Sequence, residues 1–169
     1  PVSAYAYLSA ARTSSHFLAA GFPADNIMRS ADGVTWAATA TGIPVTEGVT
    51  TLAWSGSRLV AGTASGKIYS TLTAGGTGFA LRTSGTTQRL NGSCWTGTQF
   101  FMSGDGGVIL SSTDGTTWVA RTSGTTENLY GVATSGTVHV ACGGVSDRFS
   151  ASAVILTSTN GISWTQVWN

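Results

Sequence analysis

One seven-residue pattern, Ser-x-Asp/Asn-Gly-x-Thr/Ser-Trp, occurs three times in this chain of 169 residues. It reads Ser-Ala-Asp-Gly-Val-Thr-Trp at 30–36, Ser-Thr-Asp-Gly-Thr-Thr-Trp at 112–118 and Ser-Thr-Asn-Gly-Ile-Ser-Trp at 158–164. A motif that recurs at a near-constant interval predicts an array of similar structural units, because each unit needs the same local signals. The repeat therefore constrains the fold class before any single residue is considered.

The sequence around these motifs predicts four repeats rather than three. Positions 90–104 align without a gap with 129–143, an offset of 39 residues. The hexapeptide Arg-Thr-Ser-Gly-Thr-Thr recurs at the same offset, at 82–87 and 121–126. Shifting the alignment back by 41 residues reveals a further copy with a degenerate turn at 70–79, where a phenylalanine replaces the tryptophan.

Each copy is predicted to contain four short strands, because runs rich in β-branched and aromatic residues alternate with glycine-containing turns. In the third copy the strands are expected at 90–95, 99–103, 108–112 and 117–122. The Asp-Gly or Asn-Gly pair before the fourth strand is a strong hairpin signal, since a type I′ turn needs positive φ at both central residues. No apolar period of 3.6 residues extends beyond two turns, so the chain is predicted to be all-β.

Tandem four-stranded units of about 40 residues are typical of β-propeller blades. The turn motif resembles the Asp-box (BNR) repeat of sialidase-like propellers, although the residue between Asp and Gly in that family's motif is absent here. The resemblance implies one all-β propeller domain over 1–169, with four four-stranded antiparallel blades and a period of about 41 residues. A four-bladed ring closed within one chain is expected; an eight-bladed ring of two chains, or stacking in a larger assembly, is the alternative. The blades are expected at roughly 1–45, 46–86, 87–126 and 127–169.

The composition indicates a surface that is polar through hydroxyls and backbone rather than through charge. Charged residues make up 9% of the chain, against about 25% in an average soluble protein, while Gly, Ser and Thr together account for 71 residues. Such a surface is typical of extracellular β-rich modules and of virion proteins, so a virion or extracellular location is expected. The net charge of +1 with scattered Lys and Arg predicts no nucleic-acid partner. The sequence contains no apolar run of about 18 residues, so it predicts no membrane span.

The cysteines and histidines do not predict a metal site. Cys94 and Cys142 lie at non-equivalent positions of different repeats, and two buried free thiols are expected, with a disulfide as the alternative. His16 and His139 are expected to be satisfied or partly exposed imidazoles, because no second ligand has suitable spacing. Neither a metal nor another cofactor is expected.

The residues of the turn motif are expected to be structural. A side chain that accepts hydrogen bonds from turn amides is needed once per blade, whereas a catalytic group is needed once per protein. The motif tryptophans are expected to pack between blades, with Phe79 in this role in the second copy. The structural set is Asp32, Trp36, Asp114, Trp118, Asn160 and Trp164.

An enzymatic function is not expected, and no catalytic residue is assigned. A sialidase needs an arginine triad for the substrate carboxylate, a Tyr-Glu nucleophile pair and an Asp that acts as the acid. Here Arg82 and Arg121 occupy equivalent positions of two repeats, as do the only two glutamates, Glu47 and Glu127. A glycosidase needs two carboxylates in different environments, and no pair outside the repeat symmetry supplies them. A degenerate glycoside hydrolase is kept as a third hypothesis.

Binding residues are expected where the copies differ, because a scaffold must repeat whereas a site need not. The largest deviation is an insertion at 143–153 in the fourth copy, which holds a charged pair and an aromatic residue among small ones. The linkers also carry a polar residue at one equivalent position, and in propellers such loops and linkers share one face near the axis. A merely tolerated insertion is the alternative. The predicted partner-binding residues are Asp147, Arg148, Phe149, Glu47, Gln88 and Glu127.

The predicted function is a non-catalytic structural or binding module. The low charge and the resemblance to propeller modules of bacteriophage structural proteins favour a virion protein at a tail fibre, tail tip or capsid surface. Its partner is expected to be another virion protein or a cell-surface glycan, with no nucleic acid and no membrane, and a homo-oligomer is an open alternative. A secreted glycan-binding lectin or adhesion propeller is the second hypothesis, which equivalent pockets between blades would favour.

Overall fold

The computed structural model describes residues 6–22, 27–146 and 151–168. Within these ranges the chain forms sixteen strands and two single-turn 3₁₀ helices, η1 (Val45–Glu47) and η2 (Asp105–Gly107), and no helix there is long and apolar enough to cross a membrane. In chain order the strands are β1 (Ala6–Arg12), β2 (Phe17–Phe22), β3 (Ile27–Ser30), β4 (Ala37–Ala38), β5 (Val49–Trp54), β6 (Leu59–Thr63), β7 (Ile68–Thr71), β8 (Ala80–Arg82), β9 (Leu90–Trp95), β10 (Phe100–Gly104), β11 (Ile109–Ser112), β12 (Val119–Arg121), β13 (Leu129–Thr134), β14 (His139–Ser146), β15 (Ala151–Ser158) and β16 (Thr165–Trp168).

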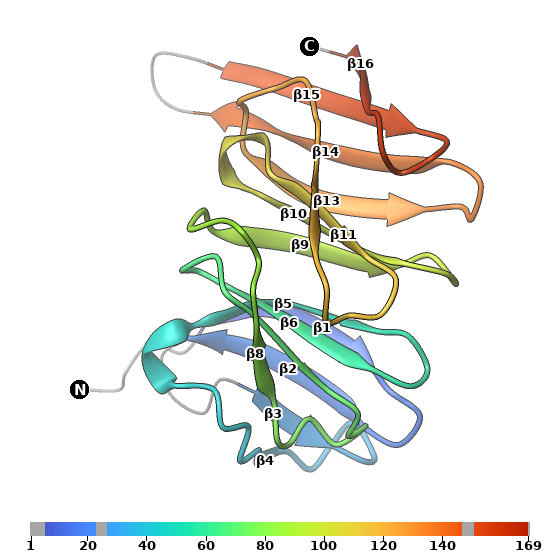
Figure 1. Cartoon of the computed structure of the whole chain (residues 1–169). Coiled ribbons are helices and arrows are strands. Elements are labelled where there is room, and N and C mark those ends of the chain that lie inside the picture. The colour runs from blue at the N-terminus through green and yellow to red at the C-terminus, as the bar shows by residue number, and fades with distance from the viewer. Residues whose placement is uncertain (1–5, 23–26, 147–150, 169) are drawn as a thin grey trace.

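Each group of four consecutive strands forms one antiparallel sheet, in which neighbours in the chain are neighbours in the sheet. The sheets are numbered here as blades one to four: β1–β4, β5–β8, β9–β12 and β13–β16. Figure 1 shows them in chain order, from blue blade one at the bottom to red blade four at the top. The prediction of an all-β propeller array of four four-stranded blades is confirmed.

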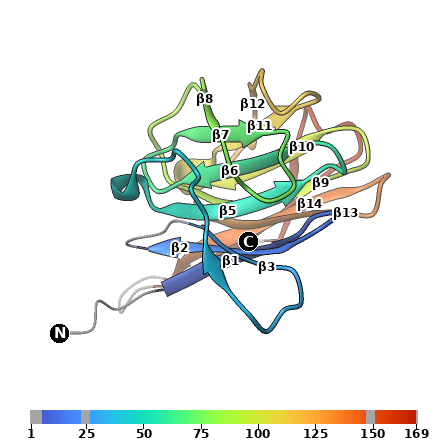
Figure 2. The same cartoon turned by 90° about the horizontal axis from the view of Figure 1, so that it is seen from below.

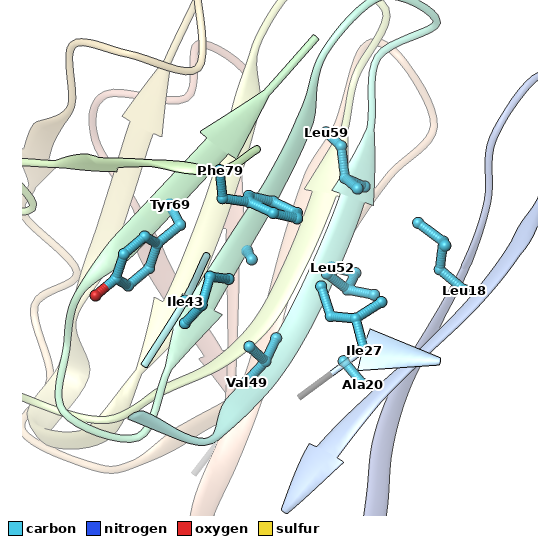
Figure 3. Packing of buried hydrophobic residues seen from close by; sticks show 10 residues of the cluster. Leu18, Ala20, Ile27, Ile43, Val49, Leu52, Leu59, Tyr69 and Phe79 are labelled. Carbon is cyan, nitrogen blue, oxygen red and sulfur yellow. The ribbon is translucent and has the colours of Figure 1, made fainter. Parts of the chain in front are cut away.

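Three apolar cores join the blades, one between each pair of successive sheets. In the first core, Leu18 and Ile27 of blade one lie in one cluster with Leu52 and Leu59 of blade two (Figure 3). A sheet buries both faces only when a layer covers each of them. The strands β6 and β10 of the two middle blades are accordingly buried along their whole length, whereas β2 of blade one has an exposed residue, Phe17, and two half-buried ones, Ala19 and Phe22.

The repeated turn motif is held by hydrogen bonds from backbone amides to its Ser and Asp side chains. In blade three, the amides two and three positions after Asp114 donate to its Oδ1 at 2.7 and 2.8 Å, and the amide of Gly115 donates to Ser112 Oγ at 2.8 Å. Gly115 has a φ of +66°, a conformation that favours glycine. The same three bonds recur around Asp32 in blade one and Asn160 in blade four.

The aromatic residue that ends each turn packs toward the preceding blade. Phe79, Trp118 and Trp164 belong to the first, second and third cores and are at most 9% exposed. Trp36, in contrast, is 40% exposed, because no blade precedes blade one in the array. Trp36 therefore departs from the inter-blade packing that the sequence predicts for it.

The blades form an open array rather than the closed ring that was expected. The inner strands contact one another in the order β1, β5, β9 and β13, but the described residues of β13 and β1 make no comparable contact. Blades one and four lie at opposite ends in Figure 1. Each sheet packs on the next through an apolar core, and no such core joins the described residues of blades one and four.

The two cysteines are free thiols in different surroundings. Cys94 is half-buried beside the third core, and burial raises the pKa of its thiol to about 11. Cys142 is exposed, contrary to the expectation of two buried thiols. The reason is the open array, because Cys142 lies on the face of blade four that no further blade covers.

Replacing Asp114 by Ala is expected to lower the free energy of unfolding by about 1–2 kcal/mol, because the turn amides lose their acceptor. Asp114→Asn is the matched control, since Asn160 accepts the same bonds in blade four at 2.9 and 3.0 Å. Urea unfolding at neutral pH, followed by tryptophan fluorescence, measures the difference. An equal loss in both variants would show that the turn needs the charge of Asp114 rather than its acceptor geometry.

Candidate functional site

One face of the array is built from the linkers between blades and the loops between the second and third strands of a blade. The loop is tied to the start of the inner strand by a repeated backbone bond, from Asp105 N to Arg89 O at 2.9 Å in blade three and from Gly144 N to Asn128 O at 2.8 Å in blade four. The helix η1, at the left in Figures 1 and 2, belongs to this face. The linker face, as it is called below, comprises 45–48, 64–67, 83–91, 104–107, 122–128 and 143–144.

The repeated hexapeptide Arg-Thr-Ser-Gly-Thr-Thr forms the linkers of this face and is itself structural. Ser123 Oγ donates to the carbonyl oxygen of Thr125 at 3.1 Å, and Ser84 Oγ donates to that of Thr86 at 3.0 Å. Gly107, with a φ of +74°, lets the loop of blade three approach the linker closely, since a Cβ at this position would lie 2.0 Å from Thr125 O. The identical linkers therefore serve to dock the loops, and function must be sought in the residues that are not repeated.

Arg89, Asn91 and Asp105 form a hydrogen-bonded chain on the linker face. Arg89 Nε donates to Asn91 Oδ1 at 3.0 Å, and Asn91 Nδ2 donates to Asp105 Oδ1 at 2.7 Å. Asn91 Nδ2 also donates to the carbonyl oxygen of Leu129 at 3.1 Å, which ties blade three to blade four. All three side chains are half-buried, so they are held in place and still reach solvent.

The aromatic ring of Phe22 brings blade one to the same face. The ring covers Gly48 so closely that any side chain there would collide with it. Arg89 Cζ lies 6.0 Å from the ring centroid, at the outer limit of a cation–π contact. An apolar ring and a guanidinium group therefore adjoin on the linker face, although they come from blades one and three.

Glu47 is buried and paired within blade two. Its carboxylate accepts hydrogen bonds from Lys67 Nζ and from Ser65 Oγ. The bond from Lys67, and then that from Ser65, lowers the pKa of Glu47 in spite of its burial, and the same pairing raises the pKa of Lys67. Glu47 thus fastens the loop of blade two to η1, which is a structural role.

Gln88 and Glu127 lie at the linker positions equivalent to Glu47. Gln88 is exposed beside Gly106, whereas Glu127 Oε2 is buried and has no hydrogen-bond partner among the described residues. In the described part of the chain, no hydrogen bond or ion pair joins Glu47, Gln88 and Glu127 to one another. The remaining predicted binding residues lie outside the described residues: Asp147, Arg148 and Phe149.

His139 is a packed and hydrogen-bonded imidazole. Its Nδ1 lies 2.9 Å from Thr134 Oγ1, and its ring centroid lies 4.8 Å from that of Phe101. Burial lowers its pKa. Within 6–22, 27–146 and 151–168, no three His, Cys, Asp or Glu side chains are grouped so that they could hold a metal ion.

Arg89, Asn91, Asp105 and Phe22 are not among the binding residues predicted from the sequence. A signal was present at position 91, the second residue of an inner strand. Its equivalent in blade two is Thr50, whose Oγ1 donates to the carbonyl oxygen of Leu90, just as Asn91 donates to blade four. A polar residue that varies between copies at this strand position marks this site.

Comparison with known proteins reveals the fold but no family. No protein-family model matches the chain, and no curated protein matches it in sequence. Among solved structures, YCF48 from Cyanidioschyzon merolae superposes with a TM-score of 0.70 at 12% identity, over 100% of this chain and 58% of that chain. A structure of YCF48 bound to D1 peptide has a TM-score of 0.68 at 17% identity, over 98% and 53% of the two chains.

A third similar structure is that of an enzyme. The glutaminyl cyclase of Myxococcus xanthus has a TM-score of 0.56 at 16% identity, over 92% of this chain and 66% of that chain. The chain thus spans little more than half the length of the YCF48 proteins that it resembles. At these identities the likeness shows a shared fold.

Glu47→Gln is expected to weaken the pH dependence of the free energy of unfolding in the acid range. Because the folded-state pKa of Glu47 is lowered, its pairing stabilises the fold fully above the unfolded-state value of about 4.3 and is lost as the pH falls below it. Lys67 is exposed and solvent screens its ion pair with Glu47, so the loss of stability at neutral pH should be small. Urea unfolding across the acid range measures both effects.

The matched control for this experiment is Glu127→Gln, at the equivalent linker position without a described partner. If both substitutions changed the pH dependence equally, the pairing with Lys67 would not be its source.

Proposed function

We propose that this chain is a non-catalytic binding module whose linker face holds an extended segment of a protein partner. The observation that carries the proposal is the chain of Arg89, Asn91 and Asp105, fixed at 2.7–3.0 Å and half-buried on a rigid scaffold. An extended peptide presents alternating amide donors and carbonyl acceptors. The guanidinium donates, the carboxylate accepts, and the neighbouring Phe22 ring offers apolar contact.

The state of the carboxylates supports a non-catalytic role. Asp32 and Asp114 accept several hydrogen bonds within their turns, which lower the pKa of each far below the usual value, and Glu47 is paired with Lys67. Groups engaged in this way are poor general acids or bases near neutral pH. The glutaminyl cyclase shows that the fold admits an enzyme, so this argument rests on the side chains of this chain rather than on the fold.

The peptide-bound YCF48 structure supports a peptide as the ligand class, because a protein of this fold is there bound to one. We also propose that the blades are of the Asp-box class and that the chain belongs to a bacteriophage virion protein or another extracellular protein. Its support is the recurrent Ser and Asp/Asn hydrogen bonding in three turns and the charged content of only 9%.

A glycan is the competing ligand, and one observation favours it. Open grooves occur at two equivalent linkers, one lined by Lys67 and 81–88 and the other by 121–126. Repeated grooves are what a lectin with several equal sites would have. Four of the hydroxyls that line them are, however, already bonded within the linker turns, which leaves fewer groups for a sugar: those of Ser84, Thr86, Ser123 and Thr125.

The proposal is tested by probing the immobilised protein with a random-peptide array and a glycan array in parallel. Peptides selected by the wild type should bind Arg89→Ala at least about tenfold more weakly, because the truncated residue anchors the network. Arg89→Lys should recover only part of the affinity, since an ammonium lacks the planar fork of a guanidinium.

The matched control is Arg12→Ala, at the far end of β1 from the linker face, which should bind the selected peptides like the wild type. Peptides that bind Arg89→Ala unchanged would exclude this face as their site. Binding to glycans alone would replace the peptide proposal by the lectin hypothesis.

A further inference from the structure

Among the described residues of the linker face, Glu127 is the charged side chain that has no partner. Glu47 is paired with Lys67, and Arg89 lies in one hydrogen-bonded chain with Asp105. The carboxylate of Glu127 makes no described hydrogen bond or ion pair, although its Oε2 is buried. The other charges of this face cancel, so Glu127 leaves it with one negative charge, whereas the whole chain has a net charge of +1.

In blade two, the equivalent carboxylate obtains its cation from the loop before the third strand. Lys67, the partner of Glu47, directly precedes an isoleucine that pairs with the fourth residue of the second strand. The corresponding isoleucines of blades three and four pair with the same position of their own second strands. They are preceded by Val108 and Val154, so neither blade has the lysine at this place.

Blade three lacks both members of this charge pair, whereas blade four lacks only the cation. Gln88 occupies the glutamate position of blade three, and its neutral amide needs no ammonium group. In blade four, Glu127 keeps the charge although Val154, at the lysine position, is 2% exposed and apolar. An unpaired carboxylate with a buried oxygen lowers stability, so the scaffold gives no reason to keep it. The exception in blade four therefore points to a cation that a partner supplies.

Neighbouring hydrogen bonds place Glu127 close to the chain that contains Arg89. Asp105, at the end of that chain, is followed by Gly106, whose amide donates to Asn128 Oδ1 at 3.0 Å. Asn128 directly follows Glu127 in the linker that enters blade four. Glu127 is half-buried, so it still reaches solvent. An extended segment held at Arg89 can therefore continue over Glu127 on the same face.

We propose that the protein segment held by the linker face carries a lysine or arginine side chain that pairs with Glu127; this rests on the proposed function and names the chemistry that the partner must present. The half-buried carboxylate has already lost part of its hydration, and a cation gives it charge-assisted hydrogen bonds. Complementary charges of this kind determine which partners a surface accepts. A segment with an acidic residue at this place is rejected, because two carboxylates would meet.

Peptides that the wild type selects from the random-peptide array test the proposal, and they should share a basic residue at one position. Glu127→Gln should bind these peptides about tenfold more weakly, because the pair loses its charge. Replacing the basic residue of the peptide by alanine should weaken binding to the wild type by a similar factor and binding to Glu127→Gln by much less. Glu127→Lys should instead select peptides with an acidic residue at that position.

The matched control is Asp114→Asn, which removes a carboxylate charge at the other end of β11 from the linker face and should bind the peptides like the wild type. If Arg89→Ala weakens binding but Glu127→Gln does not, the inference is wrong and the proposed function stands; if neither weakens binding, both are wrong. Urea unfolding in the acid range adds a further check. An equal loss of stability in Glu127→Gln and Glu47→Gln would show that Glu127 is already paired within the chain, which also overturns the inference.

Discussion

The structure depends on one constraint: a four-stranded sheet rich in apolar residues must be covered on both faces. The two middle blades meet this need, because an aromatic residue packs on the preceding blade and an isoleucine on the following one. Trp118 and Ile68 therefore meet in the second core, and Trp164 and Ile109 in the third. The burial is non-directional, but the turn motif orients it. Its hydrogen bonds end the third strand at a defined residue and thereby fix which side of the sheet the tryptophan covers.

The number of the blades and their build from four antiparallel strands could be predicted because they follow from local signals. Turn residues and a two-residue strand period act within one copy, and the period repeats them along the chain. Ring closure could not be predicted in this way, because it depends on the angle between sheets, which the packing of whole side chains sets. The exposure of Trp36 and Cys142 follows from the same cause. The sequence predicts burial for both residues, and they are exposed because they lie in the first and the last blade of the array.

The candidate site shows a similar division. Differences between the copies predict a site in the linkers and loops, and Glu47, Gln88 and Glu127 lie on the linker face. Residue type alone could not show that Glu47 forms an ion pair with Lys67, 20 positions further along the chain. Nor could it show that Arg89 reaches Asn91 and approaches a ring from blade one, because that geometry needs three blades at their actual spacing.

The open array also implies an uneven cooperativity along the chain. In a linear array, opening an end unit breaks one interface, whereas opening a middle unit breaks two. Blade two has neighbours on both faces, and it is also the copy whose turn has degenerated at 70–79. Loss of a turn signal is best tolerated where two interfaces hold the sheet. Blades one and four lack that support, which gives their intact turns a larger share in keeping the ends of the array from fraying.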